Sequence, residues 1–348
     1  MIIDCHGHFT TAPAGLEDFH RALLEPGADL RALAAAGPQG LADDDLRQVI
    51  EPNQLRLQRE RGIDVTLFSP QASSMAHHLG DAQVSAAWST ACNDVIARIC
   101  AMYPDRFVPV GQLPQSPGSA PSASVPELRR CIEELGFVAC NLNPDPTGGY
   151  WTGPPLTDPS WYPLYEAMVE LDVPAMIHVS GSCNPNFHTT GAYYLAADTT
   201  VFMALLQSDL FVRFPTLRLI LPHGGGAVPY HWGRYRGLAQ DLGYPPLEQK
   251  VLDNVYFDTC LYGYQGIRLL TEVIPTKNIL FGTEMIGAVR GIDPQSGHHY
   301  EDTKKYVDAA PSLDDADREA IFAGNALRVY PRLEAHVGAR AQSAGATA

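Results

Sequence analysis

Short apolar runs recur along the chain, each bounded by turn residues. They are rich in Val, Ile, Leu and Phe and do not alternate with polar residues, which is typical of parallel strands buried on both faces. The pattern predicts about eight strands. The runs are "MIID" at the start, "DVTLFSP" near 64, "RFVPVGQLP" near 106, "GFVACNLNP" near 136, "VPAMIHVSG" near 173, "LRLILPHGGG" near 217, "NVYFDTCLY" near 254 and "NILFGTEM" near 278.

Helix-like stretches with apolar residues at three- and four-residue steps lie between these runs. Clear examples are "AAWSTACNDVIARICAMYP", "VPELRRCIEELG", "YPLYEAMVELD" and "VFMALLQSDLFVRFP", while "QVIEPNQLRLQRERG" is expected to break early, at Pro52. Strand–helix alternation over this length predicts an α/β protein with a (β/α)8 TIM barrel in a single domain, residues 1–333. A doubly wound open sheet is the alternative, but no G-x-G-x-x-G follows the first strand.

Two segments fall outside the repeating pattern. Residues 9–50 form a long polar and Ala-rich insertion after the first strand, and we expect it to lie over the face that carries active sites in barrels. Residues 334–348, "EAHVGARAQSAGATA", are predicted to form a flexible C-terminal tail.

Composition narrows the functional class. An apolar fraction of 45% and a charged fraction of 18% are ordinary for a globular enzyme. The formal net charge of -15 argues against nucleic acid and anionic membranes as partners. The seven cysteines are scattered with no C-x-x-C, so a disulfide framework or a Cys-type zinc site is not expected. No signal-peptide pattern or membrane-spanning apolar stretch is present, and we expect a cytoplasmic protein.

Ionisable and polar residues stand where the predicted strands end. In a barrel, the C-terminal ends of the strands carry the chemistry. His6 and His8 are two residues apart and would therefore face the same side of a strand. The other residues at such ends are Asn141 and Asn143 (fourth strand), His178 (fifth), His223 (sixth) and Glu284 (eighth).

One of these histidines alone is more simply explained as a hydrogen-bonded core residue. Four histidines and a carboxylate from separate segments are difficult to bury together without a cation. Neutral imidazole with carboxylate oxygen suits zinc, with manganese or iron(II) possible, and an open coordination position marks a catalytic site. The joint pattern therefore predicts a catalytic site for a divalent metal ion.

The segments "DCHGH", "MIHVSG", "LPHGGG" and "FGTEM" resemble the metal-dependent amidohydrolase superfamily, from the first strand to about residue 332. They are closest to its branch of decarboxylases and hydratases that act on ring-cleavage acids. Glu284 stands where the superfamily usually has Asp. With "HGGGAVPYHWGR", "FGTEMIGAVRG", "CNLNPDP" and "SGSCNP", the chain is similar to the hydratases of that branch that act on 4-oxalomesaconate.

The resemblance implies water addition to a carbon–carbon double bond conjugated to carbonyl groups. His6, His8 and His178 are predicted as metal ligands, Glu284 as ligand or base, and His223 as a group that polarises substrate or orients water. For the second acid or base we nominate Glu51 in "VIEPNQ", with a solvated helix-start carboxylate as the alternative. Asp4 is expected to orient a histidine ring.

The implied substrate is a small oxo-tricarboxylate, which requires cationic and amide donors. Our candidates for binding it are Asn143, Asn184, Tyr194, Arg234 and Arg290; a surface ion pair is the alternative for each arginine. His77, His78 and the histidines of "GHHYED" are interpreted as loop residues and not as ligands.

The first lysine of the chain is Lys250. A carboxylated lysine from the middle of the barrel, which bridges two metals in binuclear members of the superfamily, is therefore not available, and we expect a single metal ion. A decarboxylase with the same metal site, a lactone or amide hydrolase, and a metal-bound scaffold without turnover remain as alternatives. "YWTGPPLTDPSWYPLY" could form a subunit interface or a lid, and we expect a homo-oligomer.

Overall fold

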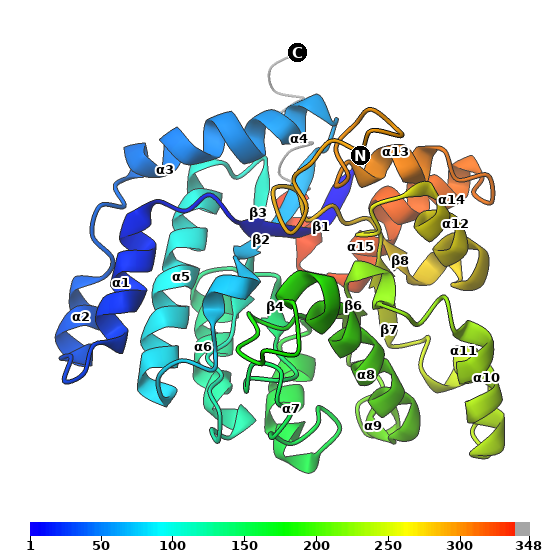
Figure 1. Cartoon of the computed structure of the whole chain (residues 1–348), viewed down its shortest axis with the longest axis horizontal. Helices are drawn as coiled ribbons and strands as arrows, with labels where there is room; N and C mark the ends of the chain where they lie inside the picture. Colours follow the sequence, from blue (N-terminus) through cyan, green and yellow to red (C-terminus); the bar gives the residue numbers. More distant parts are fainter. Residues whose placement is uncertain (338–348) are drawn as a thin grey trace.

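Eight parallel strands form one sheet in the order in which they occur along the chain (Figure 1). The computed structural model describes residues 1–337. The strands are β1 Ile3–Phe9, β2 Val65–Pro70, β3 Phe107–Gln112, β4 Ala139–Leu142, β5 Ala175–Ile177, β6 Leu219–Leu221, β7 Val255–Asp258 and β8 Ile279–Leu280. Every strand residue is buried, which explains the unbroken apolar runs of the sequence. The predicted TIM barrel is confirmed.

Hydrogen bonds between the first strand and the segment after β8 close the barrel. The backbone N–H of Cys5 donates to the carbonyl of Phe281 at 2.8 Å, and that of Glu284 donates to the carbonyl of His6 at 2.8 Å. Asp4 adds a side-chain tie, because its carboxylate accepts from the Thr283 backbone N–H at 3.0 Å and from the Thr283 hydroxyl at 2.6 Å. Asp4 thus joins the two ends of the sheet and does not orient a ring.

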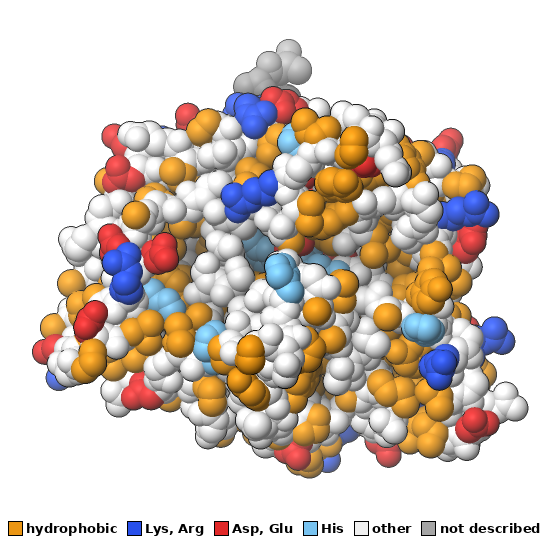
Figure 2. Space-filling model, viewed as in Figure 1, with side chains coloured by type: hydrophobic (Ala, Val, Ile, Leu, Met, Phe, Trp, Pro, Cys, Tyr) orange, Lys and Arg blue, Asp and Glu red, His pale blue; other side chains and the backbone are white. Residues whose placement is uncertain are grey.

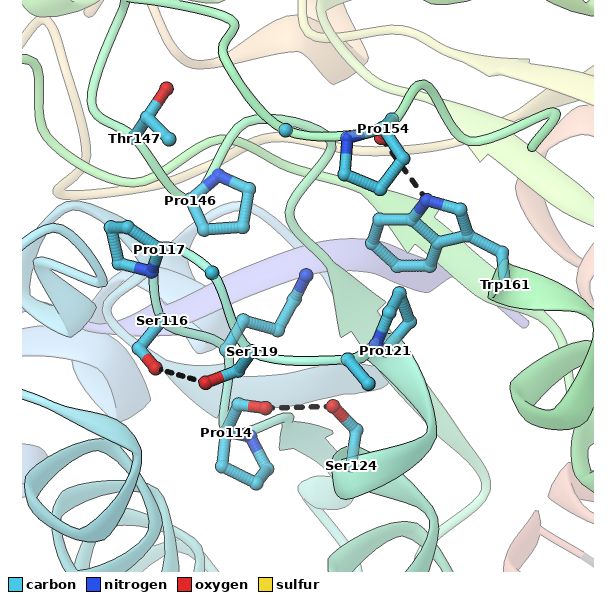
Figure 3. Close-up of a pocket in the computed structure, with 14 residues that line it drawn as sticks. Pro114, Ser116, Pro117, Ser119, Pro121, Ser124, Pro146, Thr147, Pro154 and Trp161 are labelled. Carbon is cyan, nitrogen blue, oxygen red and sulfur yellow. Dashed lines mark hydrogen bonds between the residues drawn. The ribbon is translucent and has the colours of Figure 1, made fainter. Parts of the chain in front are cut away.

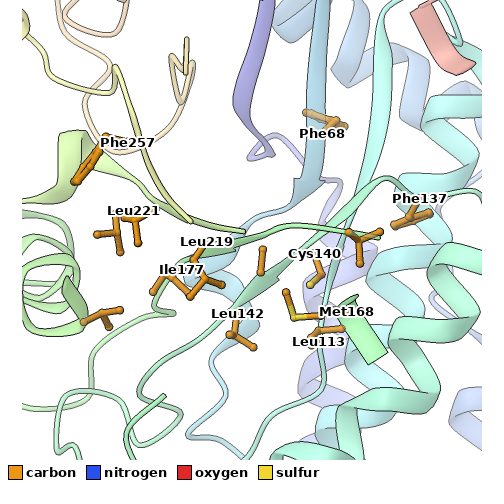
Figure 4. Packing of buried hydrophobic residues seen from close by; sticks show 14 of the residues in the cluster. Phe68, Leu113, Phe137, Cys140, Leu142, Met168, Ile177, Leu219, Leu221 and Phe257 are labelled. Carbon is orange, nitrogen blue, oxygen red and sulfur yellow. The ribbon is translucent and has the colours of Figure 1, made fainter. Parts of the chain in front are cut away.

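Helices surround the barrel, as Figure 1 shows. After the insertion they are α4 Arg56–Glu60, α5 Ala82–Met102, α6 Val125–Arg129, α7 Tyr162–Glu170, α8 Tyr194–Gln207, α9 Leu210–Arg213, α10 Trp232–Asp241, α11 Leu247–Lys250, α12 Tyr264–Val273, α13 Thr303–Asp308, α14 Asp315–Glu319 and α15 Asn325–Val329. Their apolar faces and the outward-facing strand residues form the main core; Figure 4 shows part of it around Phe68, Leu142 and Leu219.

A second apolar cluster fills the inside of the barrel. Inward-facing strand residues such as Val65, Val110 and Leu280 contact Tyr330 and Leu333, which follow α15. Val337 is buried in the same cluster. Residues 334–337, which we predicted to be part of a flexible tail, are helical, and their last residue packs in this cluster. Residues 338–348 of the predicted tail lie outside the described residues.

The insertion folds into three helices, α1 Ala14–Leu24, α2 Leu30–Ala36 and α3 Asp43–Ile50. In Figure 1, α1 and α2 lie on the flank of the molecule beside α5. Of the insertion, Thr10 lines the candidate active-site cavity described below. Residues of the insertion and of α5 also line a second, largely apolar cavity of about 380 Å³. Thr10 and Gln71 line both cavities.

Pro52 does not break its helix, contrary to our expectation. A π-helical turn, η1 Glu51–Leu55, joins α3 to α4, so the helix is continuous across the proline. A π turn changes the hydrogen-bond register locally, which accommodates a residue that has no N–H to donate. This turn determines where Glu51 lies.

Six of the seven cysteines are buried, and all seven are free thiols. In the described part of the chain, no helix is both long and apolar enough to cross a membrane.

Candidate metal centre and active site

Four side chains meet at the C-terminal end of the barrel. His6 and His8 come from β1, His178 directly follows β5, and Glu284 lies four residues beyond β8. All four are buried, and one donor atom from each lies within 4.8 Å of those of the others. Figure 2 shows histidine side chains in the hollow at the centre of this face. The structure therefore brings together the four residues predicted as metal ligands.

The register of β1 contributes to this arrangement. Asp4 pairs with Thr66 and Gly7 with Phe68, so β1 contains one extra residue between these positions. Bulges of this kind re-aim side chains beside functional sites. Here the Nε2 atoms of His6 and His8 lie 3.0 Å apart, and Nε2 of His8 lies 3.3 Å from that of His178.

Each of the three rings is held through its Nδ1 atom. Nδ1 of His6 lies 2.7 Å from Asp258 Oδ2, that of His178 lies 2.9 Å from the Val179 carbonyl, and that of His8 lies 2.7 Å from Ser69 Oγ. Carboxylate and carbonyl oxygens only accept hydrogen bonds, so the rings of His6 and His178 carry their proton on Nδ1.

The donor set fits a divalent cation. With Nδ1 protonated, the Nε2 lone pairs face one another in a buried space, which is unfavourable without a positive charge between them. The pKa values of His8 and His178 lie well below the usual range because burial disfavours the charged ring and neighbouring imidazoles add repulsion. Three neutral imidazoles and one carboxylate are ligands that suit zinc or a similar ion.

Glu284 is held by its backbone and by a tyrosine. Its φ of 51° is a left-handed conformation that is uncommon outside glycine and costs free energy. The hydroxyl of Tyr262, after β7, donates to Glu284 Oε2 at 2.6 Å. The turn closes with a bond from the Gly287 N–H to the Glu284 carbonyl at 2.8 Å.

Gly287 has no room for a side chain. A Cβ there would lie 2.5 Å from the Glu284 carbonyl oxygen and 2.6 Å from its Cγ. We therefore expect Gly287→Ala to displace the carboxylate and lower kcat by about 10²-fold, since a misplacement of about 1 Å is enough for such a loss. Steady-state kinetics of the metal-loaded variant test this. Gly153→Ala is the matched control, because a Cβ at Gly153 meets nothing within 4 Å.

His223 approaches the cluster from β6. Its Nδ1 lies 2.9 Å from Asp198 Oδ2, and its Nε2 lies 4.0 Å from Glu284 Oε2 with no hydrogen-bond partner among the described residues. Burial alone would lower the pKa of His223, but the charge and hydrogen bond of Asp198 outweigh it and raise that pKa to about 9. The unpartnered Nε2 of His223 thus lies beside the carboxylate of Glu284 at the edge of the cluster.

The cavity over the cluster has a volume of about 200 Å³. His8, His178, Glu284 and Tyr194 line it together with polar residues that the sequence analysis missed. These are Thr10, Gln71, Ser73 and Thr190. Thr10 and Gln71 directly follow β1 and β2, and Ser73 lies in the short 3-10 helix after β2, so their position just beyond strand ends was the available signal. Thr190 lies in the η6 turn Thr189–Tyr193, well beyond β5, and had no such signal.

Tyr194, predicted to bind substrate, lies in this cavity at the start of α8. Its ring centroid is 5.1 Å from that of His178 and 5.4 Å from that of His223. Burial, with the nearby charge of Glu284, raises the pKa of the phenol, so it stays protonated. Tyr194 is therefore a proton-bearing group beside the cluster.

The two asparagine candidates are occupied with protein partners. Asn143 is buried, and its Nδ2 lies 2.8 Å from Nδ1 of His77 and 3.2 Å from Ser180 Oγ. Nδ2 of Asn184 donates to the Gly149 carbonyl at 2.8 Å. Neither residue lines the cavity over the cluster.

The remaining candidates lie on the surface. Arg234 is exposed on α10, and Arg290 is exposed in the loop after Glu284, where its Nε lies 3.4 Å from the Gly287 carbonyl. Glu51 is exposed in η1 and accepts a hydrogen bond from the Tyr103 hydroxyl at 3.0 Å. The structure does not bring Glu51 to the cluster, because the continuous helix places its carboxylate next to the end of α5.

The histidines interpreted as loop residues also stay outside the cluster. His77 is buried, and its Nε2 lies 3.1 Å from the Leu113 carbonyl. His298 and His299 lie in the loop before α13, next to a different cavity. A further recess, shown in Figure 3, is lined by prolines and Trp161; its volume of about 30 Å³ suits a single water molecule.

Asp258 is a buried carboxylate beside the cluster that the sequence analysis also overlooked. It ends β7 inside the strand candidate "NVYFDTCLY", and its carboxylate binds the ring of His6. Burial alone would raise the pKa of Asp258, but the hydrogen bond from His6 and its charge outweigh burial and lower it.

The barrel and its buried candidate site for a divalent ion are the features of a barrel enzyme of the amidohydrolase type. A family model described as amidohydrolase matches residues 3–332, and the chain belongs to this family.

The chain is 58% identical to the 2-keto-4-carboxy-3-hexenedioate hydratase of Sphingobium sp. (strain NBRC 103272 / SYK-6), over 98% of this chain and 99% of that protein. It is 51% identical to 4-oxalomesaconate hydratase LigJ from Rhodopseudomonas palustris, whose crystal structure superposes with a TM-score of 0.88 over 98% and 99% of the two chains. A dihydroxybenzoic acid decarboxylase from Polaromonas sp. JS666 with bound manganese shares the fold, at 21% identity and a TM-score of 0.65 over 95% and 96%.

Proposed function

We propose that this protein is a hydratase that adds water to the carbon–carbon double bond of 4-oxalomesaconate or its 2-keto-4-carboxy-3-hexenedioate isomer, giving 4-carboxy-4-hydroxy-2-oxoadipate. The observation that carries the proposal is the buried cluster of His6, His8, His178 and Glu284, with Tyr194 beside it. The similarity of the whole chain to two hydratases supports this reaction over the decarboxylation found elsewhere in the family.

The three histidines and Glu284 would hold one divalent ion, and zinc is our first choice, with manganese or iron(II) as alternatives. Such an ion would supply Lewis acidity, which makes water acidic enough to lose a proton near neutral pH. The residues of this chain then supply the remaining requirements of the reaction: a base, an acid and a stabiliser of the developing charge.

Glu284 is the base in this proposal, because its carboxylate lies in the cavity and is fixed by Tyr262. It removes a proton from the attacking water. The hydroxyl group bonds to the alkene carbon that lies β to the carbonyl, and the electron pair of the double bond moves towards the carbonyl as an enolate.

Tyr194 is the acid, a role that we had assigned to Glu51 from the sequence. Its phenol is protonated and lines the cavity, so it can deliver a proton to the adjacent carbon. His223 donates a hydrogen bond through its unpartnered Nε2 to the oxygen on which enolate charge develops. Thr10, Gln71, Ser73 and Thr190 offer uncharged hydrogen-bonding groups for the carboxylates.

Metal removal tests the proposal. Protein treated with a chelator and desalted should lose activity to background, and zinc should restore it, because the ion activates the water. Loss of absorbance of the conjugated substrate and NMR identification of the product measure the reaction, with both double-bond isomers assayed. Gas release would indicate decarboxylation, and full activity without metal would contradict the proposed centre.

A further inference from the structure

Asp258 contacts two parts of the active site at once. Its Oδ2 lies 2.7 Å from Nδ1 of His6, with both side chains fully buried. Its Oδ1 accepts from two backbone N–H groups, those of Gly224 and Cys260, each at 3.0 Å. The carboxylate therefore has three N–H donors and no access to solvent, so each hydrogen bond is strong and costly to lose.

The Oδ2 contact determines which nitrogen of His6 carries the proton. An ionised carboxylate can only accept, so Nδ1 of His6 must donate, and the lone pair of the ring is left on Nε2. That Nε2 is the atom that lies 3.0 Å from Nε2 of His8 inside the cluster.

The Oδ1 contact holds the turn that carries His223. Gly224 follows His223 directly, and His223 has a strained φ of 52°. The Gly224 turn is also crowded, since a Cβ on Gly224 would lie 2.6 Å from the Leu261 side chain. A bond from its N–H to a buried carboxylate is therefore well placed to stabilise this conformation.

We propose that Asp258 is a positioning residue that sets the tautomer of His6 for metal binding and fixes the turn that carries His223. In this proposal Asp258 acts through these two contacts and does not itself hold the ion, although its carboxylate also lies near His6 and Cys260 in a second group of possible ligands. The inference rests on the proposed metal centre, but the tautomer of His6 can be measured independently of it.

Asp258→Asn keeps the shape of the side chain but replaces one of its two acceptor oxygens with a donor NH₂ group, so it can no longer accept hydrogen bonds at both positions. If the amide oxygen stays on the Gly224 and Cys260 N–H groups, the NH₂ group faces Nδ1 of His6. Nδ1 must then accept, and the ring proton moves to Nε2, where it blocks metal binding. The first orientation keeps all three hydrogen bonds but leaves the ring proton on Nε2, and the second, with the amide flipped, sets an NH₂ group against two N–H donors.

We expect Asp258→Asn to bind zinc about 10- to 100-fold more weakly than the wild type. Affinity is measured by competition with a chromophoric chelator. Ring ¹⁵N shifts of histidine-labelled, metal-free protein should show His6 protonated on Nδ1 in the wild type and on Nε2 in the variant. At saturating zinc, the variant should recover much of its activity.

Asp198→Asn is the matched control, because Asp198 binds Nδ1 of His223 at 2.9 Å in a pair that is also buried. We expect it to lower activity in a way that excess zinc does not correct and to leave the zinc affinity unchanged. Thermal melting of both metal-free variants checks that the fold is retained.

Wild-type zinc affinity in Asp258→Asn with His6 still protonated on Nδ1 would overturn the inference. Equal loss of zinc affinity in both variants would also overturn it, because the effect would then be general to buried Asp–His pairs. If the wild type itself binds no divalent ion, the proposed metal centre fails, and the ¹⁵N comparison still decides whether Asp258 sets the tautomer.

Discussion

Glu284→Gln is expected to reduce kcat by roughly 10²- to 10⁴-fold, the range over which a positioned base contributes to catalysis. Gln has nearly the same shape and can still accept the hydrogen bond that Tyr262 makes at 2.6 Å, so the turn and the fold should be kept. The amide cannot take a proton from water. Steady-state hydration kinetics at saturating zinc measure the loss, and circular dichroism checks the fold.

Glu51→Gln is the comparison that separates the two carboxylates named from the sequence. Glu51 is exposed and bound to Tyr103, so its substitution should leave kcat and KM close to wild type. A large loss in Glu51→Gln with little effect in Glu284→Gln would reverse the assignment of the base.

Tyr194→Phe is the second change with a large expected effect. The ring and its packing against His178 remain, and only the protonated phenol is lost. We expect kcat to fall by about 10²- to 10⁴-fold, with a much smaller change in KM, because the hydroxyl acts mainly when the carbon is protonated. Hydration in D₂O gives a second readout: wild type should place one deuterium on one face of the product carbon, and the variant should lose that preference.

Tyr264→Phe is the control for this prediction, because Tyr264 is 43% exposed and does not line the cavity over the cluster. Activity within a few fold of wild type in Tyr194→Phe, with deuterium still on one face, would rule out Tyr194 as the acid.

The strands and the cluster of predicted metal ligands could be predicted because both leave a local signal in the sequence. Strands buried on both faces give unbroken apolar runs, and an imidazole or carboxylate at the end of such a run is conspicuous. His6, His8, His178 and Glu284 satisfy this condition. The barrel then brings them together, since all the strands end at the same rim.

The residues that were wrongly assigned or overlooked depend on contacts that cannot be read from the sequence. Glu51 precedes a proline and looked like a special position, but a π turn keeps the helix continuous and leaves it on the surface. Asn143 ends a strand as expected, yet His77 and Ser180 occupy its amide. Asp258 contacts a residue 252 positions away, and the pair is revealed only by the closed barrel, in which β8 lies between β7 and β1.

In the proposed metal centre, β1 contributes two ligands and the segment after β8 contributes the fourth, so the residues that would hold the ion span most of the polypeptide. A chain emerging from the ribosome would display three imidazoles long before Glu284 appears, and the barrel seam next to Cys5 would still be open. Tight capture of the cofactor thus becomes a late event in biogenesis, coupled to the docking of the last strand on the first. Loss of the C-terminal fifth of the sequence should leave a product that no longer retains the ion during purification.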